Sequence, residues 1–198
     1  MKRRKLPIVI ALAVPLALAA CWLIATSRAA TETPEYKAIR KDGEVEIRDY
    51  PALTVATTPM NDDGMNGAFE KLFLFITGRN ERSEKIQMTS PVLIDTAKDK
   101  KTMSFIMPMK AVEEGVPKPA GDNVKLGKVE AARFGVLRFG GGRTAENEKS
   151  AVEKLKAWLD RQKIEGESIS ILAYYDPPWT PVFLRRNEVM IRIDKHHD

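Results

Sequence analysis

The sequence predicts an α+β domain in which a duplicated unit forms one antiparallel sheet or barrel, with two helices packed outside it. The chain has 198 residues, of which 43% are hydrophobic and 30% are charged, so it has enough apolar residues for one domain with a real core and does not resemble a disordered chain. Each half of the body, roughly 75 residues long, shows the order strand, helix, strand, strand, and each half has one helix with a clear apolar stripe. A duplication of this kind predicts pseudo-two-fold symmetry.

The first half opens on alternating and β-branched residues over 45–56, which predict a strand bent at Pro51. A helix is expected over 65–77, because its apolar residues recur at helical spacing. This core stripe comprises Met65, Phe69, Leu72, Phe73 and Ile76. Two strands should follow, over 88–94 and 103–107, and form a hairpin.

The second half repeats this order. Residues 124–139 resemble the first strand region, and a helix is expected over 145–163 with Thr144 as its N-cap. Its buried stripe comprises Ala151, Val152, Leu155, Trp158 and Leu159. The closing strands are expected over 169–175 and 188–193.

The net charge of +5 belongs to the N-terminus. Five of the 32 Lys and Arg residues and none of the 27 acidic residues precede residue 29, so the remaining chain carries 27 of each sign. Nucleic-acid binding needs a basic stripe on the folded domain, so we expect no nucleic-acid partner. One Cys excludes an internal disulfide framework, and the only two histidines, His196 and His197, argue against a histidine-built active site.

Residues 1–30 are predicted to be a membrane anchor or a signal segment. Residues 6–25 are uncharged, long enough to cross a bilayer as a helix, and preceded by four cations, so the body should lie on the outer side. Three interpretations stay open: an uncleaved anchor, a cleaved signal peptide, and a lipoprotein signal in which 18–21 resembles a bacterial lipobox and Cys21 is lipidated. All three place the body in the cell envelope, on the periplasmic or extracytoplasmic side. We expect a polar linker at 31–35, the body at 36–194 and a tail at 195–198.

Five segments of the body resemble the SOUL family of haem-binding proteins. They lie at 36–50, 88–92 (Met88-Thr89-Ser90-Pro91-Val92), 103–108, 117–141 and 175–189, and together they cover 36–193 in order. The resemblance implies a distorted antiparallel β-barrel with two flanking helices, built from a duplicated β-α-β-β unit. The fold of this family is also similar to that of the effector-binding domains of certain bacterial regulators. These implications agree with the repeat found in the residues themselves.

The resemblance implies that the body binds haem or another tetrapyrrole in a shallow apolar cleft beside the first helix, with basic groups reaching the propionates. Leu74 and Phe75 lie off the core stripe, so a second apolar face is available to a ligand, unless the helix is buried on two sides. Arg79 is a candidate propionate partner, or a solvated loop residue. The candidate cofactor-binding residues are Met65, Phe69, Leu72, Phe73, Leu74, Phe75, Ile76, Arg79, Met88, Tyr175, Trp179 and Glu188.

Iron ligation is the point at which the sequence departs from a simple haem protein. No histidine lies between residues 30 and 195, so Met, Tyr or the tail histidines would have to ligate the iron. We therefore expect a haem held by shape and apolar contact, for carriage, buffering or storage without catalysis.

Two residues near the C-terminus leave other functions open. Trp179 either stacks on a flat ligand or marks a rigid corner between strands. Glu188, if it points inward, could be a functional carboxylate. The alternative function is a small-molecule enzyme or effector-binding domain that uses the same crevice with Glu188 as acid or base, and a protein-interaction module is a third class.

Overall fold

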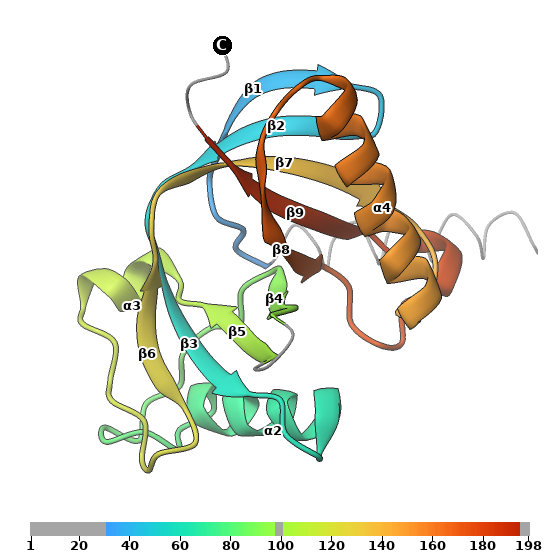
Figure 1. Ribbon diagram of the computed structural model, residues 1–198. Coiled ribbons are helices and arrows are strands. Elements are labelled where there is room, and N and C mark those ends of the chain that lie inside the picture. Colours follow the sequence, from blue (N-terminus) through green and yellow to red (C-terminus); the bar gives the residue numbers. More distant parts are fainter. Residues whose placement is uncertain (1–30, 98–100, 195–198) are drawn as a thin grey trace, which may run out of the picture. The chain divides into compact units, whose positions relative to one another are not determined.

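A single antiparallel sheet organises the chain in the computed structural model, which describes residues 31–97 and 101–194 (Figure 1). Its nine strands are β1 (Lys37–Asp42), β2 (Val45–Tyr50), β3 (Leu53–Pro59), β4 (Val92–Asp95), β5 (Thr102–Ile106), β6 (Lys125–Val129), β7 (Ala132–Phe139), β8 (Gly166–Tyr174) and β9 (Asn187–Ile193). The helices of the same described part are α2 (Gly64–Ile76), α3 (Met109–Glu113) and α4 (Ala145–Arg161). The residues from Glu32 onward form one compact unit. The predicted α+β class is confirmed.

The strand order shows the duplication directly. It runs β1-β2-β7-β9-β8-β4-β5-β3-β6, so β4 and β8 meet at the centre, and the series β5, β3, β6 on one side mirrors β9, β7, β2 on the other. The two repeated units are β2-β3-α2-β4-β5 and β6-β7-α4-β8-β9, and each unit contributes its first strand to the other half of the sheet. The sheet ends at β1 and β6 and curls without closing, which gives the distorted, open form of the expected barrel.

Helices cover one face of the sheet and leave the other face free of helices. On the helix-covered face, α2 packs against β3 and β5, and α4 packs against β7, β8 and β9. The centre of this larger core is formed by fully buried leucines, Leu72 of α2 and Leu155 of α4. On the opposite, helix-free face a second cluster contains Tyr50, Phe134 and Met190 among other apolar side chains. Strand alternation assigns each side chain to one of these faces.

Helix α4 begins as its sequence predicts. The Thr144 side chain accepts a hydrogen bond from the backbone N–H of Asn147 at 3.2 Å, and Glu146 and Glu148 lie in the first turn, where they favour the helix dipole. The helix can approach β7 closely because Gly135 has no side chain: a Cβ there would lie 3.1 Å from the Leu159 side chain. Side-chain size on the strand therefore sets how deeply α4 packs.

The buried side of α2 differs from the predicted stripe. Leu72 and Ile76 are buried as expected, but Phe75 is also buried, whereas Phe69 and Phe73 are exposed by 39% and 46%. Of the two alternatives left open for Phe75, the structure shows the buried one. Apolar residues occupy most of the circumference of α2, so the periodicity of the helix alone does not determine which side is buried. Packing against the sheet determines it.

Three segments follow weaker sequence signals than the rest. Strand β1 was not predicted, because as an exposed edge strand it has no apolar alternation. The short helix α3 was not predicted either. Strand β4 is shorter than expected and begins only at Val92, because Pro91 has no N–H to donate to a neighbouring strand. Before it, the Thr89 hydroxyl donates a hydrogen bond to the Ile106 carbonyl oxygen at 2.6 Å.

None of the helices in residues 31–97 and 101–194 is long and apolar enough to cross a membrane. The predicted anchor at 6–25, the lipidation candidate Cys21 and the predicted tail at 195–198 lie outside the described residues.

The buried side of α2 can be tested by a matched pair of substitutions. We expect Leu72→Ala to lower the free energy of unfolding by about 2–5 kcal/mol, because it opens a cavity in the main core. We expect Phe73→Ala to lower it by less than about 1 kcal/mol, because its ring is half in solvent. Urea unfolding of residues 30–198 measures both values. Equal losses from the two variants would contradict the orientation described here.

Candidate functional site

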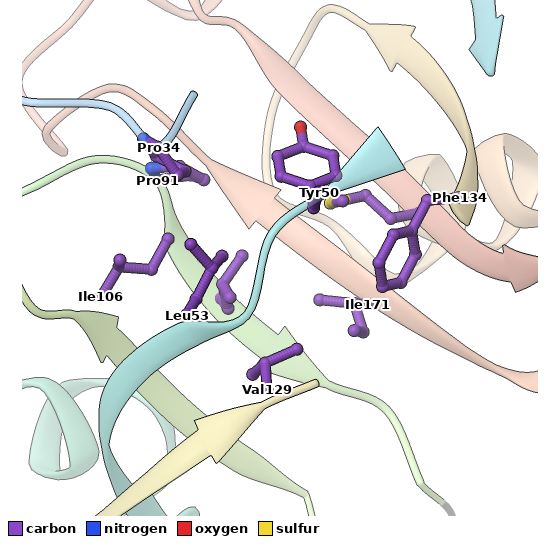
Figure 2. A pocket seen from close by; sticks show the side chains of 10 residues that line it. Pro34, Tyr50, Leu53, Pro91, Ile106, Val129, Phe134 and Ile171 are labelled. Carbon is purple, nitrogen blue, oxygen red and sulfur yellow. The ribbon is translucent and has the colours of Figure 1, made fainter. Parts of the chain in front are cut away.

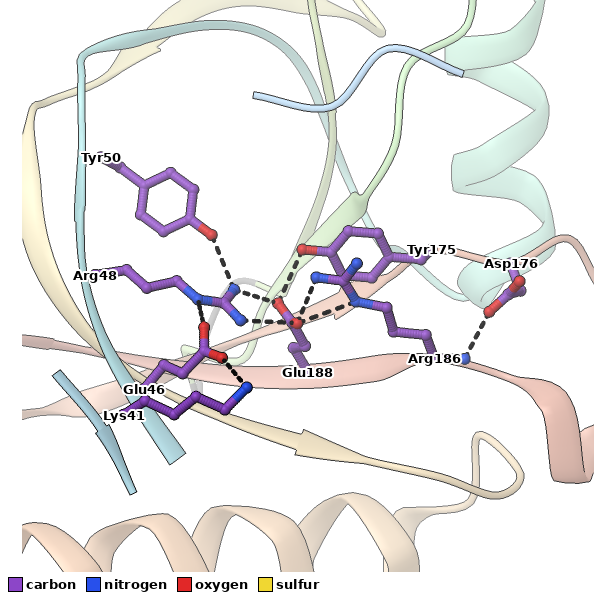
Figure 3. Close-up of polar contacts among 8 residues, drawn as sticks. All are labelled: Lys41, Glu46, Arg48, Tyr50, Tyr175, Asp176, Arg186 and Glu188. Atoms are coloured by element: carbon purple, nitrogen blue, oxygen red, sulfur yellow. Dashed lines mark hydrogen bonds and ion pairs between the residues drawn. The ribbon is translucent and has the colours of Figure 1, made fainter. Parts of the chain in front are cut away.

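Glu188 lies at the centre of a buried polar cluster on the helix-free face (Figure 3). Arg48 donates to its two carboxylate oxygens at 2.8 and 3.2 Å. Arg186 donates to Oε1 through Nη2 at 2.7 Å and through Nε at 3.1 Å, and the Tyr175 hydroxyl donates to Oε2 at 2.8 Å. The side chain of Glu188 is fully buried and points inward, and the structure brings together Glu188 and Tyr175, two of the candidate residues.

The two arginines decide the charge state of this carboxylate. Burial by itself would raise the pKa of Glu188, but the hydrogen bonds and positive charges of Arg48 and Arg186 outweigh it and hold the pKa below the ordinary value of 4.5. Burial and the charge of Glu188 raise the pKa of Tyr175, so its hydroxyl keeps its proton. A deprotonated carboxylate with no exposed surface has neither a proton to give nor contact with a substrate. This geometry therefore argues against Glu188 as a general acid or base.

A second layer of side chains holds Arg48 in place. Its Nε donates to Glu46 at 2.8 Å, and Lys41 pairs with the other oxygen of Glu46 at 3.1 Å. Its Nη1 also donates to the Tyr50 hydroxyl at 3.2 Å, and its guanidinium lies 4.3 Å from the centre of the Tyr36 ring. Every nitrogen of the Arg48 guanidinium already has a partner, so Arg48 is not free to bind a propionate.

An apolar pocket lies beside this cluster on the same face (Figure 2). Pro34 and Pro91 lie at one edge, and Val129 and Phe134 lie nearer the other. Its complete lining is Pro34, Tyr50, Leu53, Pro91, Leu93, Ile106, Val129, Phe134, Ile171 and Met190. The free space is about 30 Å³, enough for one or two water molecules, whereas sites that enclose small molecules measure roughly 300–1,000 Å³. In this form the pocket cannot enclose a tetrapyrrole.

The candidate residues of α2 form an apolar surface on the helix-covered side. Phe69 and Phe73 stack with their ring centroids 5.9 Å apart and their planes 15° apart, and Phe105 of β5 meets Phe69 edge-on at 5.3 Å. Met65, one turn before Phe69, and Met88 are half-buried and pack against the main core. Two aromatic rings therefore lie open to solvent over a rigid apolar base.

The basic candidate lies on the other flank of α2. Arg79 lines a hollow of about 60 Å³ together with Lys71 and Phe75, and the chain at 119–124 closes its other side. Successive residues of a helix are rotated by 100°, so Lys71 and Phe75 lie on one flank of the buried stripe of α2 and Phe73 lies on the other flank. Lys71 is already paired with Asp63 at 2.5 Å. The exposed rings and the nearest basic groups are thus not on one surface, and Leu74 lies half-buried between the two flanks.

The side chains present suit the ring of a haem better than its iron. Among the described residues no group of three or more His, Cys, Asp and Glu side chains could hold a metal ion. The candidate thioethers, those of Met65 and Met88, already fill space against the core. The aromatic surface of α2, in contrast, matches the flat apolar face of a porphyrin.

The structure distributes the candidate residues over three places. The α2 residues, Arg79 and Met88 belong to the helix-covered side, while Tyr175 and Glu188 belong to the helix-free side. Trp179 stands in the loop between β8 and β9 with 83% of its surface exposed, and contributes to neither.

Sequence reasoning missed Arg48, Arg186 and Tyr50. A signal for Arg48 was present, since Glu46, Arg48 and Tyr50 alternate along β2 and so must share one face of the sheet. The apolar pocket residues had no such signal, because isoleucine, leucine and valine in strands are indistinguishable from ordinary core.

Comparison with known proteins gives one family and one fold. A family model described as SOUL heme-binding protein matches residues 31–192. The chain is 28% identical over 178 residues to heme-binding protein 2 of Homo sapiens, a match that covers 82% of this chain and 86% of that protein.

Three solved structures share the fold at low identity. The C-terminal domain of EcmrR superposes with a TM-score of 0.56 at 10% identity, over 81% of this chain and 98% of that domain. An uncharacterized conserved protein of Listeria innocua gives 0.55 at 11% identity, over 76% and 92% of the two chains. A hydrolase of Listeria innocua gives 0.52 at 10% identity, over 79% and 94%. At such identities the likeness concerns the fold alone.

The buried cluster predicts a large and pH-dependent contribution to stability. We expect Glu188→Gln to lower the free energy of unfolding at pH 7 by about 3–5 kcal/mol, because it removes the buried carboxylate that pairs with the buried Arg48 and the half-buried Arg186. Since the folded-state pKa of Glu188 is lowered, its contribution is present above the unfolded value near 4.5 and is lost as the pH falls through the folded value. Urea unfolding between pH 7 and pH 3 measures both effects.

The matched control is Glu167→Gln, whose carboxylate is 55% exposed and lies 3.7 Å from Arg192. It should change the free energy of unfolding by less than about 1 kcal/mol at any of these pH values. A Glu188→Gln loss no larger than that of the control would show that the cluster does not hold the fold together.

Proposed function

The chain belongs to the SOUL family of haem-binding proteins, and from this we propose that it binds haem or a related tetrapyrrole on the open aromatic surface of α2, for carriage, buffering or storage without catalysis. The proposed location of the ligand on α2 rests on the exposed, stacked pair Phe69 and Phe73. Contiguous apolar surface of this kind marks a binding site more often than isolated exposed residues do.

The geometry of this surface suits a flat macrocycle. Phe69 is held from below by Phe105, and Met65 extends the same helix flank by one turn. A porphyrin laid across these rings gains contact area without displacing core side chains. Aromatic contacts of this kind contribute about 0.5–1.5 kcal/mol each beyond the area they bury.

The charges nearby favour recognition of the ring over recognition of the iron. Lys71 and Arg79 lie on the other flank of α2, so the propionates of a haem on the Phe69–Phe73 surface would remain largely in solvent. A bound haem would supply a redox-active iron, while the chain supplies the apolar platform and leaves the ring edge accessible. Such an arrangement suits a carrier, from which ligand is easily released.

We also propose that the domain is exported and tethered to the membrane of the cell envelope through residues 6–25. The proposal is supported by the uncharged length of this stretch and by the four cations before it. The two forms of tether, a spanning helix and a lipid on Cys21, differ in their chemistry and can be separated by experiment.

The ligand surface is tested by titrating residues 30–198 with hemin and following the Soret band. We expect saturable one-to-one binding, about ten-fold or more weaker in the Phe69→Gln, Phe73→Gln variant, since two aromatic contacts are lost. Iron-free protoporphyrin should bind with the same affinity as hemin.

The control is Phe183→Gln, which removes an equally apolar but even more exposed ring far along the chain. It should leave hemin binding unchanged. Weakening by Arg79→Gln and not by the double variant would move the site to the other flank of α2. Linear, unsaturable uptake by all forms would contradict tetrapyrrole binding.

The tether is tested by fractionating cells that express the full chain. We expect the wild-type protein to remain with the membranes after an alkaline carbonate wash, and its body to be accessible to protease from the outer side. A lipid anchor predicts that the wild-type chain incorporates labelled palmitate and that Cys21→Ser does not, whereas a spanning helix predicts no incorporation by either chain. Recovery of the full-length wild-type chain in the soluble fraction would exclude both forms.

A further inference from the structure

The loop between β8 and β9 carries the two most exposed large apolar side chains among the described residues. Trp179 and Phe183 are each 83% exposed, and Val182, at the start of a short 3₁₀ helix (Val182–Leu184), is 48% exposed. We call these three residues the aromatic tip. Neither the aromatic surface of α2 nor the cluster around Glu188 includes them.

The backbone beneath the tip is fixed by buried or half-buried polar groups. Arg143 donates to the carbonyl oxygen of Asp176 at 2.5 Å, and Arg185 donates to the carbonyl oxygens of Thr180 and Pro178 at 2.8 and 2.5 Å. Asp176 and Thr180 are themselves about 95% buried. The aromatic side chains are therefore presented to solvent by a held loop, not by a loose one.

The charges nearest the tip are mainly positive. Over residues 176–186 the single acidic residue is the buried Asp176. Arg185 belongs to the loop and Arg143 lies beneath it, whereas Arg186, also in the loop, is already paired with Glu188. A surface that combines exposed Trp and Phe side chains with arginines is complementary to the interface of an anionic bilayer.

The start of the domain lies at the same end of the sheet as the tip. Glu32 forms a bridge with Thr89, and three residues later Val92 pairs with Tyr174, after which the chain enters the loop. Figure 1 shows the start of the described chain beside the end of β8. Only six residues, 26–31, separate Glu32 from the uncharged stretch at 6–25, and six extended residues span about 20 Å at most.

From these observations we propose that the aromatic tip inserts into the headgroup region of an anionic lipid bilayer and docks the domain on the membrane. The proposal rests on the tether through residues 6–25 given under the proposed function. Docking would orient the sheet relative to the lipid surface.

The test uses the full chain reconstituted into vesicles of mixed phosphatidylglycerol and phosphatidylcholine. Phe183→Cys carries an environment-sensitive NBD label, and Lys154→Cys, on the exposed side of α4, is the matched control. The wild-type chain treated with the same reagent gives the background from Cys21. We expect a blue shift of NBD emission and quenching by lipid-borne nitroxides at position 183, and neither at position 154. Both effects should weaken in vesicles of phosphatidylcholine alone.

Flotation of the same samples and a hemin titration separate the possible failures. If both chains float but position 183 behaves like position 154, the docking is overturned while the tether stands. If neither chain floats, the tether is wrong and the docking falls with it, whereas hemin binding is judged by its own titration. A blue shift at position 183 without vesicles would mean that a second copy of the chain or the domain itself covers the tip, which also overturns the proposal.

Discussion

The ion pair between Glu188 and Arg48 is the constraint on which the arrangement of the sheet depends. Arg48 belongs to β2 and Glu188 to β9, and β7 lies between them, so the contact reaches across two strand spacings. A carboxylate without exposed surface is costly unless every oxygen is paired, and here five hydrogen bonds from three side chains meet that need. Any slip of β2 against β7 by one residue would turn Arg48 to the other face and leave Glu188 unpaired. The pair therefore fixes the register at the place where one repeat contributes its strand to the other.

The sheet also separates the buried polar cluster and its small pocket from the exposed aromatic surface of α2. The helix-free side has a polar cluster whose donors are occupied and a pocket with room for little more than water. The helix-covered side has the open rings of α2. The surface proposed for a planar ligand therefore lies on the helix-covered side, on the open rings of α2.

How much the sequence predicted depended on whether the relevant signal was local. The repeat, the two long helices α2 and α4, and the N-cap at Thr144 follow from spacing and residue type within short windows, and they were predicted closely. The buried side of α2 was not predicted, because a helix that is almost wholly apolar has no preferred face in its sequence. Its packing against the sheet determines which face is buried. Glu188 was singled out from its place at the start of a strand, but its partners were not, since Arg48 lies 140 residues away and only the strand exchange brings it near.

That exchange of first strands has a bearing on the history of the fold. A single repeat folded by itself would leave β7 without β2, or β3 without β6, and so would expose an unpaired strand edge. Two copies of one repeat could cover both edges by trading their first strands, which is the geometry of a swapped dimer. The present chain has the arrangement that results when the genes of such a dimer are fused, with the segment between β5 and β6 as the joint. The pseudo-two-fold symmetry of the single chain is therefore the symmetry that a strand-swapped pair of separate repeats would have.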